Sequence, residues 1–169
     1  MTIDHIYLRA PEPEDVDRLF LWENDSEDGL HGHWARAPLS RFQIWEYVNS
    51  YDANPTTQDG LRLMVVCGGE TVGTVDLYDI DLYNRHASIG IYISRQWRGK
   101  GIGKLTIESV ETYASGKLGL HSLSAYCIGD NVVSHRLFEV AGFEIAGRLK
   151  ENVRIGKRYH DMDIFNKIL

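Results

Sequence analysis

A short turn rich in glycine and positive charge is the part of the sequence best suited to bind a ligand. It reads RGKGIGK and runs from Arg98 to Lys104, with glycine at positions 99, 101 and 103. Glycine lets a ligand approach the backbone closely, and the N–H groups at the start of a helix attract anions. Because an apolar strand-like run precedes the turn and a helix-like run follows it, the sequence predicts an anion-binding turn that suits phosphate.

Two common phosphate motifs do not fit the spacing of this turn. A P-loop needs a glycine five residues before Gly103 and a serine or threonine after Lys104, but these positions hold Arg98 and Leu105. A Rossmann fingerprint spaces its glycines as G-x-G-x-x-G within a parallel βαβ unit, whereas this turn has G-x-G-x-G. The remaining pattern, R-G-x-G-x-G after a strand, resembles the pyrophosphate loop of the Gcn5-related N-acetyltransferase (GNAT) family.

A second segment carries the same resemblance. The family has the pattern N-x-x-[AS]-x-x-x-Y-x-x-x-G-F, and residues 131–143 match it at four positions: Asn131, Ser134, Gly142 and Phe143. Phe138 stands where many members have tyrosine. Residues 72–103 look most like the spermidine/diamine N-acetyltransferase branch. The resemblance implies an acetyl-CoA-dependent N-acetyltransferase that acts on a primary amine, with a polyamine as the leading acceptor.

The resemblance also implies where acetyl-CoA binds. The strands at residues 86–94 and 122–128 would splay apart and leave a slot for the pantetheine arm. The implied cofactor-binding residues lie on the first strand, in the turn and on the later helix: Ile91, Tyr92, Ile93, Arg98, Gly99, Lys100, Gly101, Ile102, Gly103, Lys104, Asn131, Ser134 and Phe138. A backbone N–H near Ile91 would stabilise the negative charge that develops on the thioester oxygen.

Acetyl transfer to an amine requires two proton movements, because an ammonium must lose a proton and the departing thiolate benefits from gaining one. Two positions depart from the spermidine branch: Ser88 replaces a glutamate, and Phe138 replaces the tyrosine acid. By resemblance, Asp79 matches an acid that binds substrate, and Ser134 matches a serine that protonates sulfur in N-terminal acetyltransferases. Tyr126 is a third catalytic candidate. Each has a structural alternative: a turn cap, a bond to the helix backbone, or core packing.

Two features near the expected acceptor site have simpler interpretations. His31 and His33 in HGHW are spaced like metal ligands, but no third ligand accompanies them, so no metal is expected and a loop lining the acceptor site is favoured. Asp76 and Asp79 lie three residues apart, so on a regular strand they would face opposite sides of the sheet.

Composition restricts the class of protein. The chain has 169 residues, of which 43% are hydrophobic and 25% charged, as in a soluble globular domain, and we expect residues 1–169 to form one domain. The net charge of −6 disfavours a nucleic-acid partner. No apolar run is long enough to span a membrane and no signal peptide begins the chain, so we expect a cytoplasmic protein. Cys67 and Cys127 are expected to be buried free thiols, and a homo-oligomer is compatible with the sequence.

Periodicity and turn residues predict an α+β fold with the order β-α-α-β-β-β-α-β-α-β-β. The expected strands are residues 4–10, 61–67, 71–80, 86–94, 122–128, 144–155 and 159–168, and the expected helices are 12–25, 39–51, 102–119 and 131–141. The resemblance adds a mixed, mostly antiparallel sheet, splayed at two strands and flanked by helices. Two alternatives to the polyamine enzyme stay open: a non-catalytic acyl-CoA-binding regulatory module, and an acetyltransferase of peptide or ribosomal-protein N-termini.

Overall fold

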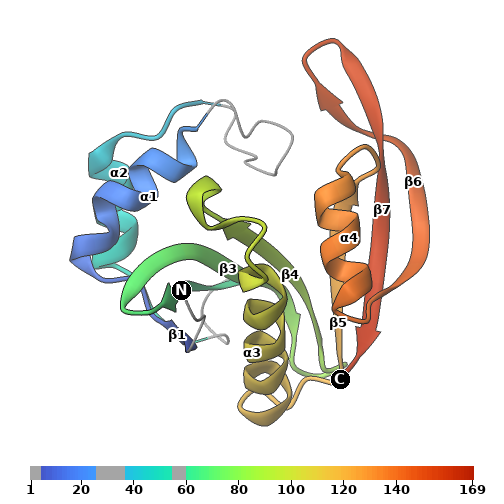
Figure 1. Cartoon of the computed structure of the whole chain (residues 1–169), viewed down its shortest axis with the longest axis horizontal. Helices are drawn as coiled ribbons and strands as arrows, with labels where there is room; N and C mark the ends of the chain where they lie inside the picture. The colour runs from blue at the N-terminus through green and yellow to red at the C-terminus, as the bar shows by residue number, and fades with distance from the viewer. Residues whose placement is uncertain (1–4, 26–36, 55–59) are drawn as a thin grey trace.

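The computed structural model describes residues 5–25, 37–54 and 60–169, and it forms one sheet of seven strands in the order β1-β2-β3-β4-β5-β7-β6 (Figure 1). The strands are β1 (Ile6–Arg9), β2 (Gly60–Cys67), β3 (Glu70–Asp81), β4 (His86–Ile93), β5 (Ser122–Ile128), β6 (Glu144–Ile155) and β7 (Arg158–Ile168). The α-helices are α1 (Val16–Glu23), α2 (Arg41–Asn49), α3 (Ile102–Gly116) and α4 (Val132–Val140). The predicted order of helices and strands is confirmed.

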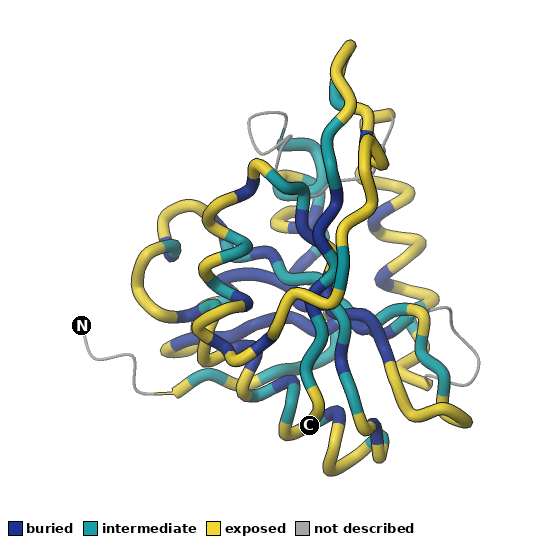
Figure 2. The backbone as a smooth tube through the Cα atoms, turned by 90° about the vertical axis from the view of Figure 1, so that its right-hand side faces the viewer, coloured by how far each residue is buried: buried dark blue, intermediate teal, exposed yellow. Residues whose placement is uncertain are grey.

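The helices cover opposite faces of the sheet. On one face, α3 and α4 bury Ile107, Val110 and Phe138 in a core that includes Leu77 and Leu123. On the other face, α1 and α2 form a smaller apolar cluster whose buried members are Leu19, Ile44, Val48 and Met64. Figure 2 shows the buried residues concentrated along the middle of the sheet, while the far end of the β6–β7 hairpin is exposed.

Strand pairing produces the predicted splay. β4 and β5 run parallel and pair at three positions, ending at Ser88 opposite Ser124. Beyond this point β4 stays paired with β3 as far as Ile93, whereas β5 stays paired with β7 as far as Ile128. Each strand therefore follows a different partner, and the two strands diverge (Figure 1). The region between their unpaired edges is called the slot below.

Local signals in the sequence fix several element ends. Ser40 begins α2 as part of a capping box, and Gly142 ends α4 with φ 85°. One prediction was too coarse: the expected helix at residues 12–25 divides into a 3₁₀ turn, η1 (Pro13–Asp15), and α1.

Cys67 and Cys127 are buried free thiols, as expected. Within the described ranges, no helix is both long and apolar enough to cross a membrane.

A buried ion pair fixes the N-terminal segment to the sheet. The Arg9 guanidinium donates to both carboxylate oxygens of Asp15 at 2.6 and 2.9 Å, and it also donates to the Thr71 hydroxyl on β3. The Asp15 carboxylate, which is fully buried, also accepts a hydrogen bond from the Glu12 N–H. Burial alone would raise the pKa of Asp15, but the hydrogen bonds from Arg9 and Glu12 outweigh it and hold the pKa below its ordinary value.

We expect this pair to make stability depend on pH. Because the pKa of Asp15 is lower in the folded than in the unfolded state, its contribution is present above about pH 4 and is lost as the pH falls through the folded pKa. Asp15→Asn should cost about 3 kcal/mol of unfolding free energy at pH 7, since it leaves Arg9 without its carboxylate, and should cost less near pH 3.

Urea denaturation of wild type and variant at both pH values measures this difference. Asp17→Asn is the matched control, because the Asp17 side chain is 76% exposed and should have a small effect at both pH values. An Asp15→Asn cost that does not shrink on acidification would contradict the assignment.

Candidate functional site

The slot between β4 and β5 begins beyond Ser88, and its β4 side holds three of the predicted cofactor residues: Ile91, Tyr92 and Ile93. The side chains of Ile91 and Ile93 pack against the core under α3. Tyr92 points to the opposite face, where its ring lies 5.5 Å from the Trp22 ring of α1. The side chains of these residues are therefore engaged in packing, and their backbone is the part that can serve a ligand.

The glycine turn presents open backbone at the start of α3. Gly99 has φ 72° and Gly101, the N-cap of α3, has φ 81°, a region that other residues rarely adopt. A Cβ added at either position would meet no described atom within 4 Å. The backbone is therefore shaped by glycine and accessible from outside, as the predicted phosphate-binding turn requires.

Gly103 and Ile102, in contrast, have packing roles. A Cβ on Gly103 would lie 3.1 Å from a methyl carbon of Leu137, so this glycine lets α3 and α4 approach closely. Ile102 is buried in the core. The sequence pattern placed both residues among the cofactor-binding residues. In the structure, helix packing alone explains why glycine stands at position 103, and core burial explains why isoleucine stands at position 102.

The basic residues around the turn have partners within the protein. Arg98 Nε donates to the Ile93 carbonyl at 2.7 Å and so ties the turn to the end of β4. The Lys100 ammonium lies 4.7 Å from the centre of the Trp97 ring. Lys104 forms a 2.6 Å ion pair with Glu108, one helical turn later, and the pair is half exposed. Lys100 therefore lies beside the turn with its charge over an aromatic ring, whereas the charge of Lys104 is paired with that of Glu108.

The first turn of α4 is fixed by Asn131. This buried residue is the N-cap, and its Oδ1 accepts a hydrogen bond from the Ser134 N–H at 3.1 Å. Ser134 is half-buried at the third position of the helix. Phe138 is only 3% exposed, and its ring packs against Phe143 and Phe165. Phe138 is therefore a core residue on the buried side of α4.

Asp79 lies in a β-bulge of β3, where the pairing with β4 shifts between Tyr78 and Asp81. Its φ is 50°, an uncommon value for a residue other than glycine. Its Oδ2 lies 3.5 Å from the hydroxyl oxygen of Ser88, slightly longer than an ordinary hydrogen bond. The bulge thus brings the exposed Asp79 carboxylate close to Ser88, the serine that stands where the resemblance to the spermidine branch implies a glutamate.

The expectation that Asp76 and Asp79 face opposite sides is wrong. Asp76 pairs with Gly90 and Tyr78 pairs with Ser88, so Asp76 and Ser88 share one face of the sheet. Asp79 would face the other side on a regular strand, but the bulge and the positive φ turn its carboxylate towards Ser88. A rule based on alternation cannot anticipate an inserted residue.

Arg62 on β2 holds Asp76 in place, and sequence reasoning missed this contact. The Arg62 guanidinium donates to both oxygens of Asp76, at 2.7 and 3.1 Å, and to Glu23 of α1 at 2.5 Å. The Tyr51 hydroxyl donates to the Arg62 carbonyl. The one available signal was an arginine within an apolar strand, which indicates a buried partner but does not identify it.

Two tyrosines join Asp79 and Ser88 on this face. Tyr126 follows Ser124 on β5 by two residues, so it points to the same face as Ser88, and it is 42% exposed. Burial, together with the neighbouring Asp79, Tyr126 and Asp76, raises the pKa of Tyr78 to about 12. Of the three predicted catalytic residues, Asp79 and Tyr126 therefore lie on the face covered by α1 and α2, whereas Ser134 belongs to α4 on the other face.

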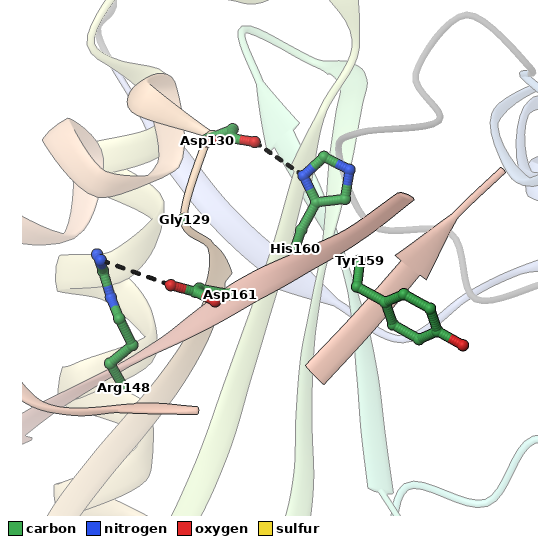
Figure 3. A pocket seen from close by; sticks show the side chains of 6 residues that line it. All are labelled: Gly129, Asp130, Arg148, Tyr159, His160 and Asp161. Carbon is green, nitrogen blue, oxygen red and sulfur yellow. Dashed lines mark hydrogen bonds and ion pairs between the residues drawn. The ribbon is translucent and has the colours of Figure 1, made fainter. Parts of the chain in front are cut away.

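A separate polar pocket of about 260 Å³ lies beyond the end of β5 (Figure 3). Its lining residues are Gly129, Asp130, Arg148, Tyr159, His160 and Asp161. His160 Nδ1 lies 2.8 Å from Asp130, and Arg148 lies 3.8 Å from Asp161. These charges therefore pair with one another within the pocket. The predicted acceptor loop with His31 and His33 lies outside the described residues.

Comparison with known proteins finds relatives of the whole chain. Residues 5–144 match the pattern of the acetyltransferase (GNAT) domain. The spermidine N(1)-acetyltransferase of Escherichia coli (strain K12) is 26% identical over 156 residues, covering 92% of this chain and 82% of that protein.

Solved structures agree with the sequence comparison. Spermidine N-acetyltransferase from Vibrio cholerae, in complex with CoA and spermine, has a TM-score of 0.84 at 25% identity and covers 96% of this chain and 95% of that one. The ribosomal L7/L12 alpha-N-protein acetyltransferase RimL, solved with coenzyme A, has a TM-score of 0.86 at 20% identity, covering 98% and 95% respectively, and shares the fold.

The capping role of Asn131 can be tested separately from ligand binding. Asn131→Ala should cost about 1 kcal/mol of unfolding free energy, because the Ser134 N–H loses its acceptor. Asn131→Asp keeps a carboxylate oxygen in that place and should cost less. Urea denaturation measures both, with Ser40→Ala on α2 as a reference for the loss of a cap. Equal destabilisation by aspartate and alanine would show that the cap is unimportant.

Proposed function

The chain belongs to the GNAT acetyltransferase family and is an acetyl-CoA-dependent N-acetyltransferase, and on this premise we propose that its acceptor is a polyamine bound through Asp79. The observation that carries the proposal is the bulge in β3, which presents the exposed Asp79 carboxylate beside Ser88 at the mouth of the slot. A carboxylate in this place attracts an ammonium group. Polyamines carry several ammonium groups, so one can bind Asp79 while another reaches the slot.

The slot and the turn suit acetyl-CoA. Gly99 and Gly101 leave backbone N–H groups open to the pyrophosphate, and Lys100 adds positive charge. On its slot side, the β4 backbone from Ile91 to Ile93 pairs with no strand among the described residues and can bond the pantetheine arm. When bound, acetyl-CoA supplies the acetyl group as a thioester.

The residues of the chain would perform three tasks in the transfer. Asp79 Oδ2 attracts the acceptor ammonium and takes its proton, directly or through water. The backbone N–H near Ile91 stabilises the charge that develops on the acetyl oxygen. The Ser134 hydroxyl on the opposite side, or that of Tyr126, gives a proton to the departing sulfur. A positioned acid or base typically contributes about 100-fold or more to the rate.

A peptide or ribosomal-protein N-terminus is the second candidate acceptor. The putative ribosomal N-acetyltransferase YdaF of Bacillus subtilis (strain 168) is 26% identical over 162 residues, which equals the identity of the spermidine N(1)-acetyltransferase match. Sequence identity therefore does not separate the two acceptors, and the exposed Asp79 carboxylate is the observation that favours a polyamine. A non-catalytic acyl-CoA-binding module is not favoured, because the chain belongs to a family of enzymes.

The turn can be tested by placing a methyl group on its open backbone. Gly101→Ala should weaken CoA binding about tenfold, because it obstructs one charge-assisted hydrogen bond to the pyrophosphate. Gly119→Ala is the matched control: Gly119 also has a positive φ, 64°, and an added Cβ there would meet no described atom, but it lies at the far end of α3. Calorimetry measures both affinities. An equal loss in the two variants would indicate backbone strain and remove the turn from the proposal.

The acceptor can be tested at Asp79. Asp79→Asn should raise the KM for spermidine on the order of fivefold, since an exposed ion pair is worth roughly 1 kcal/mol, and should leave the KM for acetyl-CoA unchanged. Asp52→Asn is the control: it removes the same charge but keeps an oxygen that can accept the hydrogen bond from the Asn54 N–H. Thiol release with spermidine and with N-terminal peptides measures the effect. If Asp79→Asn acetylates spermidine as well as wild type does, or if wild type prefers the peptides, the polyamine proposal fails.

A further inference from the structure

The alternating β4 residues Ser88, Gly90 and Tyr92 lie on the face of the sheet that α1 and α2 cover. Ser88 is only 5% exposed and Tyr92 only 8% exposed, so the chain itself fills the space around both side chains. Gly90 lies between them, is partly exposed and has no side chain. Among the described residues, Gly90 is therefore the position at which β4 leaves its backbone uncovered on this face.

The neighbours of Gly90 keep this place open. Its cross-strand partner is Asp76, whose two carboxylate oxygens are both bound by Arg62 on the strand beyond, so the Asp76 side chain is held away from Gly90. A Cβ added to Gly90 would have one described atom within 4 Å, Cε1 of Tyr78 at 3.6 Å. The Tyr78 ring thus borders the uncovered backbone on one side.

The chemistry of the slot assigns this face to the acceptor. The glycine turn leads directly into α3, so the cofactor that binds there approaches from the α3 side. The amine must attack from the side that the cofactor leaves free, which is the face of Ser88, Gly90 and Asp79. On that face, Gly90 is a β4 residue without a side chain, and a Cβ added there would meet no described helix atom within 4 Å.

We propose that the acceptor carbon bonded to the attacking nitrogen lies over Gly90, and that Gly90 sets how much branching at this carbon the enzyme accepts. The inference rests on the proposed acetyl transfer in this slot, but it does not depend on whether the acceptor is a polyamine. The Tyr78 ring forms one wall of this acceptor position, and the Asp76–Arg62 pair keeps the position clear. Gly90 acts here as a specificity-determining residue.

Gly90 can be substituted to test the inference, because a Cβ fits at this position without backbone strain. The φ of Gly90 lies outside the left-handed region, and a contact of 3.6 Å to Tyr78 is an ordinary van der Waals distance. Gly90→Ala and Gly90→Val should therefore fold. Gly147→Ala is the matched control, because Gly147 also lies in a strand without positive φ and its added Cβ would meet no described atom.

The probes are CoA derivatives that extend from the slot without needing a reaction. Three conjugates carry the group S–CH₂–CO–NH–R on CoA, where R is hydrogen, n-propyl or isopropyl. The first conjugate ends at the nitrogen. The n-propyl and isopropyl conjugates each add three carbons beyond the nitrogen, and only the isopropyl group is branched at the carbon bonded to it. Calorimetry measures the dissociation constant of each for wild type and for the three variants.

We expect Gly90→Val to bind the unsubstituted conjugate with a dissociation constant within about twofold of the wild-type value. The same variant should bind the n-propyl conjugate about tenfold more weakly than wild type does, because the valine methyl groups would occupy space that the propyl group needs. The isopropyl conjugate should lose more affinity than the n-propyl conjugate. Gly90→Ala should show the same order with smaller losses, and Gly147→Ala should show none.

Two results would overturn the inference. An equal loss for all three conjugates would place Gly90 against the cofactor, and no loss for any of them would place the acceptor elsewhere. Neither result depends on spermidine kinetics, so failure of the polyamine proposal and failure of this inference are distinguished by separate measurements.

Discussion

The divergence of β4 from β5 is the constraint on which the functional arrangement depends. Beyond Ser88 and Ser124, β4 remains bonded to β3 and β5 remains bonded to β7, so each strand has one paired edge and one edge that faces the slot. Backbone polar groups inside a protein require hydrogen-bond partners, and a gap between two strands accepts a third extended chain. A pantetheine arm has that shape and those hydrogen-bonding groups, which explains how one geometric feature creates the binding site.

The features around the slot fall into two groups, one on each face of the sheet. On the face of α3 and α4, glycines at the start of α3 expose backbone, Gly103 allows the two helices to approach, and Asn131 fixes the start of α4. We assign these features to the cofactor. On the face of α1 and α2 lie Asp79, Ser88 and Tyr126, which we assign to the acceptor amine. In this proposal the acetyl group passes from one face of the sheet to the other through the slot.

On the proposed acceptor face, a carboxylate lies on β3 beside the β4 position where the spermidine branch carries one. Ser88 lacks the carboxylate that the spermidine branch carries at this place, yet a bulge in the neighbouring strand brings the Asp79 carboxylate to within 3.5 Å of the Ser88 hydroxyl. A positive φ at Asp79 is unfavourable for a residue with a side chain, and such backbone strain is often found at functional sites. We therefore propose that the neighbouring strand supplies the acid.

The sequence by itself determined the family, the order of the elements and the place of the glycine turn before α3, because these depend on local signals. Glycines with positive φ, capping residues and alternating apolar residues act over a few positions, and they can be recognised without knowing which segments meet. The splay was expected through the resemblance, and strand register confirmed it.

Tertiary structure alone decided which way Asp79 points, what holds Asp76, and that Phe138 is a core residue. These outcomes depend on contacts between segments far apart in the chain: a shift in register between β3 and β4, an arginine on β2, and aromatic rings from β7 and the end of α4. Strand alternation predicted the wrong face for Asp79, because one bulge reverses the side on which the next residue lies. The open position at Gly90 is likewise visible only once its cross-strand neighbours are known.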